Sequence, residues 1–288
     1  MQSPISPTVR RRRLARELRR LRESHHLKLS EAAKQAKVPL STLSNIENAE
    51  AKRIKARDID ALAALYEAPD EVRTALHELS RESKEQGWWS NYKDVFGGNA
   101  LPDFEVEASM IRSYECMVIP GLLQTPDYSE AVFRGGCAYS EAEVTRHVAA
   151  RMQRQHILGR HKPPHLWAVI DEAALRRELD DSDIMREQLD HLLNMATRHN
   201  IDIQVLPFSA GMHAGMSGSF VLLDFPGELD PSLVYTETAT DSLFVQESDS
   251  VQRFVTIFSH LNAAALRTSR TMGFIQSILE SNNHHEHH

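Results

Sequence analysis

The stretch 28-KLSEAAKQAKVPLSTLSNIEN-48 decides the fold of the amino-terminal part of this chain. Ser30 is a favourable helix N-cap, and the alanines of the EAAKQAK segment that follows suit a helix closely approached by another helix. Val38-Pro39 ends this helix, because proline lacks the N–H that a helix interior needs. Proline is tolerated at the start of the next helix, LSTLSNIEN. The stretch therefore predicts two short helices joined by a tight turn.

The second of these helices separates apolar from polar side chains. Leu43 and Ile46 fall on one face, as the core residues of an amphipathic helix do. Short polar side chains, which suit contact with base edges, point elsewhere; they are Ser41, Thr42, Ser44 and Asn45. The stretch therefore predicts a helix–turn–helix that binds duplex DNA.

The segment resembles the Xre and lambda-repressor-like helix–turn–helix family in Ala33, in Val38 and in the run Ser41–Glu47. It departs from the family pattern at Leu29, which often is a phosphate-contacting Gln, and at Lys37 and Ala49, which usually are glycine. A left-handed turn conformation costs a non-glycine residue about 1 kcal/mol. The resemblance implies that Asn45 makes a bidentate contact to adenine. The base-contacting residues that it implies are Leu40, Ser41, Thr42, Ser44 and Asn45.

Positive charge is confined to this end of the chain. Residues 1–57 hold 15 Lys and Arg against 5 Asp and Glu, whereas residues 58–288 hold 18 against 35. An arginine-rich helix face can simply be solvated, but beside a helix–turn–helix we expect it to contact phosphate. The expected phosphate contacts are Arg10, Arg11, Arg12, Arg13, Arg16, Lys28, Lys52, Arg53, Lys55 and Arg57, and Arg19, Arg20 and Arg22 line the same first helix.

Length and composition bound the rest of the chain. With 288 residues, 41% hydrophobic and 25% charged, a globular protein of two domains is expected. No apolar run approaches the ~20 residues that span a bilayer, and no apolar signal region precedes the basic segment, so a cytoplasmic protein is expected. Cys116 and Cys137 lie in no CxxC or Cys/His spacing, which gives no support for a disulfide framework or a zinc site.

Composition shifts divide the chain into four parts. Amphipathic helices over 56–67 and 69–85 complete a five-helix, all-α domain at residues 1–85. A turn-rich linker at 86–104 contains Trp88 and Trp89, for which simple packing is favoured over docking of one domain on the other or lining of a ligand pocket. An α+β domain with a small mixed sheet follows at 105–281. The histidine-rich residues 282–288 are expected to be a disordered tail and are excluded from the fold.

The second domain shows both periodicities. A helix is expected near 105–115, and another opens at Ser140 with the capping box that Glu143 completes. A further helix is expected to open at Pro126-Asp127, others are expected at 181–200, 251–266 and 269–281, and strands are expected at 165–171, 201–208, 219–225 and 233–237.

Several short motifs occur in one order in this domain. They are Pro120-Gly121-Leu122-Leu123-Gln124 with Tyr128, Arg151 with Arg154-Gln155, the run Asp171–Arg176, Arg186 with Gln188-Leu189 and Leu192, Val205-Leu206-Pro207-Phe208 with Gly211, Gly218-Ser219-Phe220, and Val234-Tyr235 with Glu237. The order resembles actinomycete two-domain regulators that join an Xre helix–turn–helix to an antitoxin-like, WhiJ-like domain, over residues 10–270. The resemblance implies transcriptional control, often of development or secondary metabolism, and a small acidic partner protein commonly encoded nearby.

Residue types that catalysts use are present without the spacing that catalysis needs. The segment 215–219 lacks the last glycine of a G-x-S-x-G elbow, and the chain has no H-E-x-x-H and no glycine-rich phosphate loop. Asp171-Glu172 stands at a strand-to-helix junction, where carboxylates cap helices. We expect no enzymatic activity, no metal and no cofactor. The residues weighed were Asp171, Glu172, His213, Ser217, Asp224 and Glu237.

Two functions for the second domain stay open. It dimerises and binds a small partner protein that switches DNA affinity, or it senses a small molecule in a pocket shaped by the glycine-rich 211–218 segment and aromatic side chains. A homodimer on a palindromic operator is expected, because one small helix–turn–helix buries little DNA surface. The ligand or partner candidates are Trp88, Trp89, Trp167, Phe208, Phe220 and Tyr235.

Overall fold

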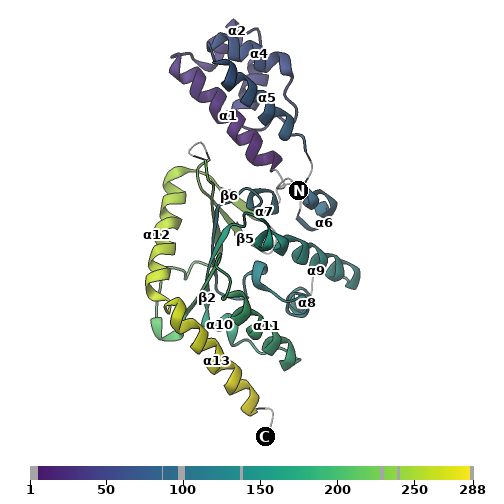
Figure 1. The fold of residues 1–288 in the computed structure, drawn as a ribbon, viewed down its shortest axis with the longest axis vertical. Helices are drawn as coiled ribbons and strands as arrows, with labels where there is room; N and C mark the ends of the chain where they lie inside the picture. The colour runs from purple at the N-terminus through teal and green to yellow at the C-terminus, as the bar shows by residue number, and fades with distance from the viewer. Residues whose placement is uncertain are drawn as a thin grey trace. The chain divides into compact units, whose positions relative to one another are not determined.

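A computed structural model describes residues 6–85, 87–96, 101–136, 139–227, 230–238 and 241–285 (Figure 1). Cys137 lies outside these residues. The chain divides into two compact units. Unit 1 comprises Met1–Glu107 and Phe225–Pro231, and unit 2 comprises Ala108–Asp224 and Ser232–His288.

Unit 1 is built on a bundle of five helices, which confirms the predicted all-α domain. Its helices are α1 (Pro7–Ser24), α2 (Leu29–Gln35), α3 (Leu40–Glu47), α4 (Ala56–Leu65) and α5 (Asp70–Glu82). The core holds apolar side chains from all five, so the amphipathic face of each short helix is buried. Its members include Leu14, Leu18, Ala32, Leu43, Ile46, Ile59, Leu62 and Leu76.

The helix–turn–helix differs from the prediction at the N-cap of α2. At Lys37 and Ala49 its backbone has the left-handed conformation expected of a turn. Helix α2 begins at Leu29, and the Lys28 N–H donates to the Glu31 carboxylate at 2.8 Å, so the prediction of Ser30 as N-cap was wrong. Lys37 and Ala49, where related sequences have glycine, have φ of 55° and 60°. Both positions thus keep a left-handed backbone conformation, which is strained for a residue that has a side chain.

Residues 88–107 form part of unit 1, where a linker over 86–104 was predicted. They contain η1 (Trp88–Tyr92), α6 (Lys93–Phe96) and α7 (Leu101–Glu105). Trp88 and Trp89 pack with Phe96 and Val106 in a small apolar cluster, with Trp88 edge-on to the other two rings. Both tryptophans thus pack within unit 1, and Trp89 also lines a groove of that unit.

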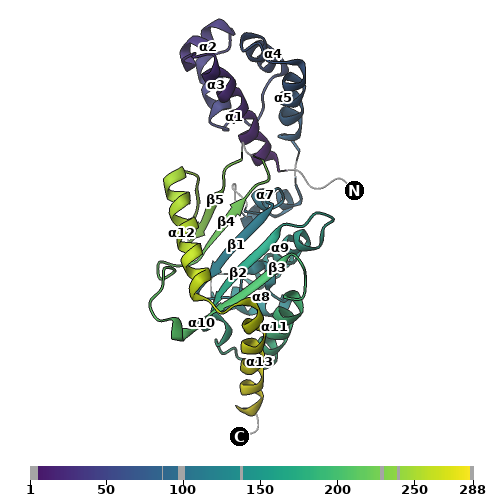
Figure 2. The same cartoon turned by 60° about the vertical axis from the view of Figure 1, so that its left-hand side comes forward.

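Unit 2 contains a six-stranded mixed sheet in the order β3-β2-β1-β4-β5-β6 (Figure 2). β1 is parallel to β2, and β2 is parallel to β3, whereas β4, β5 and β6 each run antiparallel to their neighbours. The α+β class with a mixed sheet is confirmed. The strands are β1 (Met110–Glu115), β2 (His165–Asp171), β3 (Ile201–Leu206), β4 (Phe220–Asp224), β5 (Leu233–Glu237) and β6 (Ser242–Val245).

The prediction of a helix near 105–115 was wrong, because residues 110–115 form β1 at the centre of the sheet. Ile111 and Tyr114 are three residues apart, as on one face of a helix, yet β1 lies between two other strands and buries both. The strand β6 was not predicted.

Helices cover both faces of the sheet, with α12 on one face and α8, α9 and α11 on the other (Figure 1). Helix α12 packs Phe258 and Leu261 onto Tyr114, Val169 and other side chains of the first face. Helix α13 continues to His285, into the segment predicted to be a disordered tail. The helical elements are η2 (Gly121–Leu123), α8 (Pro126–Gly135), α9 (Glu141–Gln155), η3 (His156–Gly159), α10 (Glu172–Leu175), α11 (Ser182–Met195), η4 (Phe208–Ala210), α12 (Ser248–Ala264) and α13 (Thr268–His285).

Candidate functional site

The predicted recognition helix α3 buries its apolar face and leaves its short polar side chains at the surface. Leu43 and Ile46 are buried, whereas Leu40 is 50% exposed. Ser41 and Asn45 are exposed, and Thr42 and Ser44 are half-buried. A helix with this surface can enter the major groove, where short polar side chains meet base edges.

Arg22 holds α3 against α1 and is therefore a structural residue. Its Nε and Nη2 donate to the two Glu47 carboxylate oxygens at 2.8 and 2.9 Å, and Nη1 donates to the Leu27 carbonyl at 2.7 Å. The hydrogen bond from Arg22 to Glu47 raises the pKa of the guanidinium above its ordinary value. This bidentate pair fixes the end of the recognition helix.

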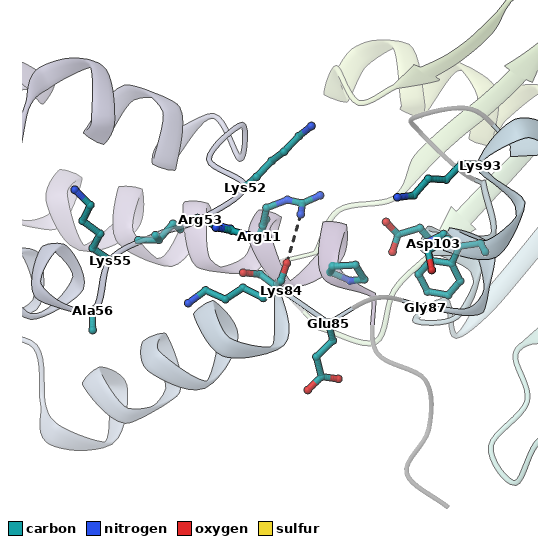
Figure 3. Close-up of a pocket in the computed structure, with 15 residues that line it drawn as sticks. Arg11, Lys52, Arg53, Lys55, Ala56, Lys84, Glu85, Gly87, Lys93 and Asp103 are labelled. Atoms are coloured by element: carbon teal, nitrogen blue, oxygen red, sulfur yellow. Dashed lines mark hydrogen bonds between the residues drawn. The ribbon is translucent and has the colours of Figure 1, made fainter.

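A basic groove in unit 1 gathers four of the predicted phosphate contacts (Figure 3). The groove has a volume of about 1200 Å³ and includes the loop that follows α3, the carboxyl end of α5 and the short helix α6. Glu85 and Asp103 are its carboxylates. Sequence reasoning missed two of its cations, Lys84 and Lys93, because only the fold brings them beside the α3–α4 loop. The cations are Arg11, Lys52, Arg53, Lys55, Lys84 and Lys93.

Three arginines of α1, which were expected to contact phosphate, contact side chains of unit 1, so their contact with phosphate stays a prediction. Arg10 pairs with Glu82 at 3.1 Å and with Glu107 at 2.8 Å. Arg13 pairs with Glu107 at 3.0 Å and with Asp230 of the β4–β5 loop. These carboxylates neutralise the guanidinium groups within the unit.

Arg12 is the third of these arginines, with 8% of its surface exposed. Its guanidinium lies 5.6 Å from the ring centroid of Phe104 and 5.9 Å from that of Phe225. Burial lowers its pKa to about 10, and burial also lowers the pKa of the half-buried Arg16. Lys28 and Arg57 are exposed, so their contact with phosphate stays a prediction.

A second charged cluster lies in unit 2, at the carboxyl end of β1. Glu115 ends that strand, and the charges of Arg151 and Arg154 on α9 act to lower the pKa of its carboxyl. A Cβ atom on Gly121 would lie 3.4 Å from Arg154 Nη1 and 3.5 Å from Arg151 Nε. The two guanidinium groups therefore lie together against the backbone of η2.

Hydrogen bonds fix this cluster in place. Arg151 Nη1 donates to Gln124 Oε1 at 2.6 Å, and Gln155 Nε2 donates to the carbonyls of Gly121 and Gln124 at 3.0 and 2.7 Å. The Arg151 guanidinium lies 4.2 Å from the centroid of the Phe133 ring. Burial lowers the pKa of Arg151 to about 10.

The surroundings of Glu115 favour the neutral form of its carboxyl. Burial raises its pKa to about 7, although Ser219 and the two arginines act in the opposite direction. Tyr235 on β5 has a pKa raised by burial and by Glu237. Several motif residues quoted from the sequence, which are far apart along the chain, thus meet at this end of the sheet.

Two family models match the chain. Residues 13–76 match a helix-turn-helix domain, and residues 99–277, more than half of the chain, match a domain of unknown function (DUF5753). The chain belongs to the DUF5753 family. No curated protein and no solved structure matches it. The helix–turn–helix match covers the recognition helix, and the DUF5753 match covers the Glu115–Arg151 cluster.

The aromatic residues predicted to shape a pocket in the DUF5753 domain do not meet in one place. Phe220 is buried, and it packs with the half-buried Trp167 in the core under α12. Phe208 is 61% exposed. Tyr235 is paired with Phe244 and alternates with the core residue Val234, which places it on the opposite face of the sheet. The predicted pocket is therefore wrong in its residues, and Tyr235 belongs to the charged cluster.

The carboxylates of the DUF5753 domain that were weighed as catalysts have structural contacts. Asp171 caps α10 by accepting from the Ala173 N–H at 2.9 Å, as the sequence predicted. Asp224 accepts two hydrogen bonds from Arg112, at 3.0 and 2.8 Å. That the chain has no enzymatic activity stays a prediction. Among the described helices, none has both the length and the apolar character needed to cross a membrane.

Proposed function

We propose that this chain is a sequence-specific transcriptional regulator of the Xre type, which reads DNA with α3 and contacts phosphates through the basic groove. The helix–turn–helix match supports DNA binding, and the surface of α3 carries the proposal of sequence reading. Asn45 is exposed and its amide can bond the N6 and N7 edge of adenine. The six cations of the groove supply the contacts that set the position of the protein on the duplex.

The regulator acts as a homodimer on a palindromic operator. One bundle with an eight-residue recognition helix contacts few base pairs, and a second copy related by two-fold symmetry raises affinity and specificity. Sedimentation of the free protein measures this state. A monomer that binds a palindrome and its isolated half-site with equal affinity would contradict it.

The antitoxin-like role of the DUF5753 domain is supported by an exposed apolar loop. Phe208, Met212 and Met216 are 61%, 84% and 59% exposed within residues 208–216. Exposed methionines and aromatic residues suit an interface that adapts to a partner. We propose that this loop binds the small acidic protein that related regulators have encoded nearby.

This partner is tested by co-expression with the small acidic protein encoded beside the gene, followed by size-exclusion chromatography of the full chain. A complex that Met212→Glu abolishes and Leu243→Glu leaves intact supports the proposal, since Leu243 is an exposed apolar residue on β6, outside the loop. No complex, or equal loss in both variants, contradicts it.

DNA reading is tested by selection from a random duplex library with the full chain and with Asn45→Ala. We expect a palindromic consensus for the wild type and a relaxed preference, with about 10-fold to 100-fold weaker binding, for the variant. Asn194→Ala, at an exposed asparagine of α11, is the matched control. The proposal fails if the wild type enriches no sequence.

A further inference from the structure

We propose that the DUF5753 domain binds a small oxyanion, the carboxylate or phosphate group of an effector, between Arg151 and Arg154 of α9, Gly121 of η2 and Glu115 of β1. The effector role rests on the proposed function, whereas binding of the oxyanion itself does not require it. The site lies wholly within unit 2.

The sheet brings two residues of the cluster to one of its ends. β4 runs antiparallel to β1, and β5 runs antiparallel to β4, so β1 and β5 run in the same direction. The carboxyl ends of these two strands therefore lie at the same end of the sheet. Glu115 is the last residue of β1, and Glu237 is the last residue of β5.

The arginines present the donors that an oxyanion needs. Arg151 is half-buried, and among the residues that the structure describes it makes one side-chain hydrogen bond, to Gln124, and no ion pair. A guanidinium has five N–H donors in a planar fork that matches a carboxylate or a phosphate. Its plane is held by the Phe133 ring at 4.2 Å. The donors of Arg151 that remain are thus oriented before a ligand arrives.

Gly121 lets both guanidinium groups lie against the backbone of η2. A Cβ atom there would already be in van der Waals contact with Arg154 Nη1 and Arg151 Nε, so a larger side chain would displace the two groups. A backbone without a side chain also lets a ligand approach closely. The motif glycine thus allows the two arginines to lie together at the backbone.

Glu115 makes the site sensitive to pH. The groups that face its carboxyl are Ser219, Arg154, Arg151 and Glu237. When Glu115 is protonated it can donate a hydrogen bond to an oxyanion, and when it is ionised it repels the same ligand. Because its pKa is about 7, binding should weaken as pH rises through that value, by up to about tenfold per pH unit.

The test measures thermal stabilisation of the full chain by sodium sulfate and by sodium acetate, against sodium chloride at equal ionic strength. Neither anion titrates between pH 6.5 and about 8.5, so any change in affinity over this range comes from the protein. Stabilisation by sulfate points to a phosphate group, and stabilisation by acetate points to a carboxylate. Either result supports the proposal if Arg151→Gln removes it and Arg198→Gln, at an exposed arginine outside the cluster, leaves it intact.

Two further variants keep the result interpretable. Gly121→Val retains both arginines and should abolish anion binding by displacing their guanidinium groups, even if Arg151→Gln fails to fold. Glu115→Gln should retain binding and lose its pH dependence. The proposal is overturned if neither anion stabilises the chain more than chloride, or if every variant responds like the wild type. Failure of the DNA selection would leave these results unchanged, so the two proposals fail separately.

Discussion

Arg13 in unit 1 and Arg151 in unit 2 are both partly buried arginines, yet their surroundings differ. Arg13 pairs with the carboxylates of Glu107 and Asp230, whose side chains are 8% and 4% exposed. Arg151 lies beside Glu115 without forming an ion pair among the described residues. A cation whose charge is neutralised by fixed carboxylates stabilises the fold, whereas a cation that is held in place without an ion pair is suited to an external anion.

The largest effect is expected at the paired site. Arg13→Gln leaves the buried Asp230 carboxylate without its partner, so the free energy of unfolding should fall by about 3 kcal/mol. Arg19→Gln is the control, because Arg19 and Glu23 are exposed and such pairs contribute below about 1 kcal/mol. Urea unfolding of the full chain compares the two. Equal losses would show that Arg13 is not a structural cation.

Glu115→Gln tests the cluster around Arg151 in the absence of a ligand, through the pH dependence of the stability of the chain. The fold raises the Glu115 pKa from 4.5 to about 7, so the stability that this raised pKa gives is complete below pH 4.5 and is lost as pH rises through 7. Relative to the wild type, the variant should gain about 2 to 3 kcal/mol in free energy of unfolding between pH 5 and pH 8.5.

The control for this change is Glu187→Gln, at an exposed carboxylate of α11. It should show no difference from the wild type that depends on pH. If Glu115→Gln is equally stable relative to the wild type at both pH values, the carboxyl is not held in its neutral form.

The groove provides a third class of cation in the exposed lysines Lys84 and Lys93. Lys84→Gln and Lys93→Gln should each reduce the slope of log K against log salt for operator binding by about 1 and leave urea unfolding unchanged. Lys162→Gln removes the same charge from an exposed position in unit 2 and should leave the slope unchanged. Identical slopes for all four proteins would remove the groove from the DNA interface.

The smallest effect is expected at the exposed Lys37, where two variants distinguish the contribution of the side-chain charge to stability from that of the backbone conformation. Lys37 has a φ of 55°, so Lys37→Gly should raise the free energy of unfolding by about 1 kcal/mol, and Lys37→Ala should change it little. Thermal unfolding of both variants measures this. If Lys37→Ala raises the free energy of unfolding as much as Lys37→Gly does, the gain comes from removing the lysine charge and not from relieving backbone strain.

The helix–turn–helix was predictable because its signals are local. Pro39 separates two helices that the apolar spacing of Leu43 and Ile46 and the run of alanines already favour. The central strand β1 was missed for a physical reason. It is covered on both faces, so alternation of apolar and polar residues, the usual sign of a strand, is weak in MIRSYE.

The candidate sites were predictable only in part. Lys52, Arg53 and Lys55 follow the recognition helix, and their common location was expected. The partner of Arg13, Asp230, lies 217 residues further along the chain, and no local pattern relates the two. The Glu115–Arg151 cluster was likewise hidden, since its motif residues were visible in the sequence but only the sheet order brings them together.

The loop Phe225–Pro231 belongs to unit 1 although the strands on either side of it belong to unit 2. A gene truncated after residue 107 would therefore encode a helix–turn–helix module that lacks Asp230 and Phe225, the contacts of Arg13 and Arg12. Exchange of residues 1–107 alone between two such chains would therefore separate α1 from the loop that it contacts. A substitution in this loop must be compatible with Arg12 and Arg13 of α1.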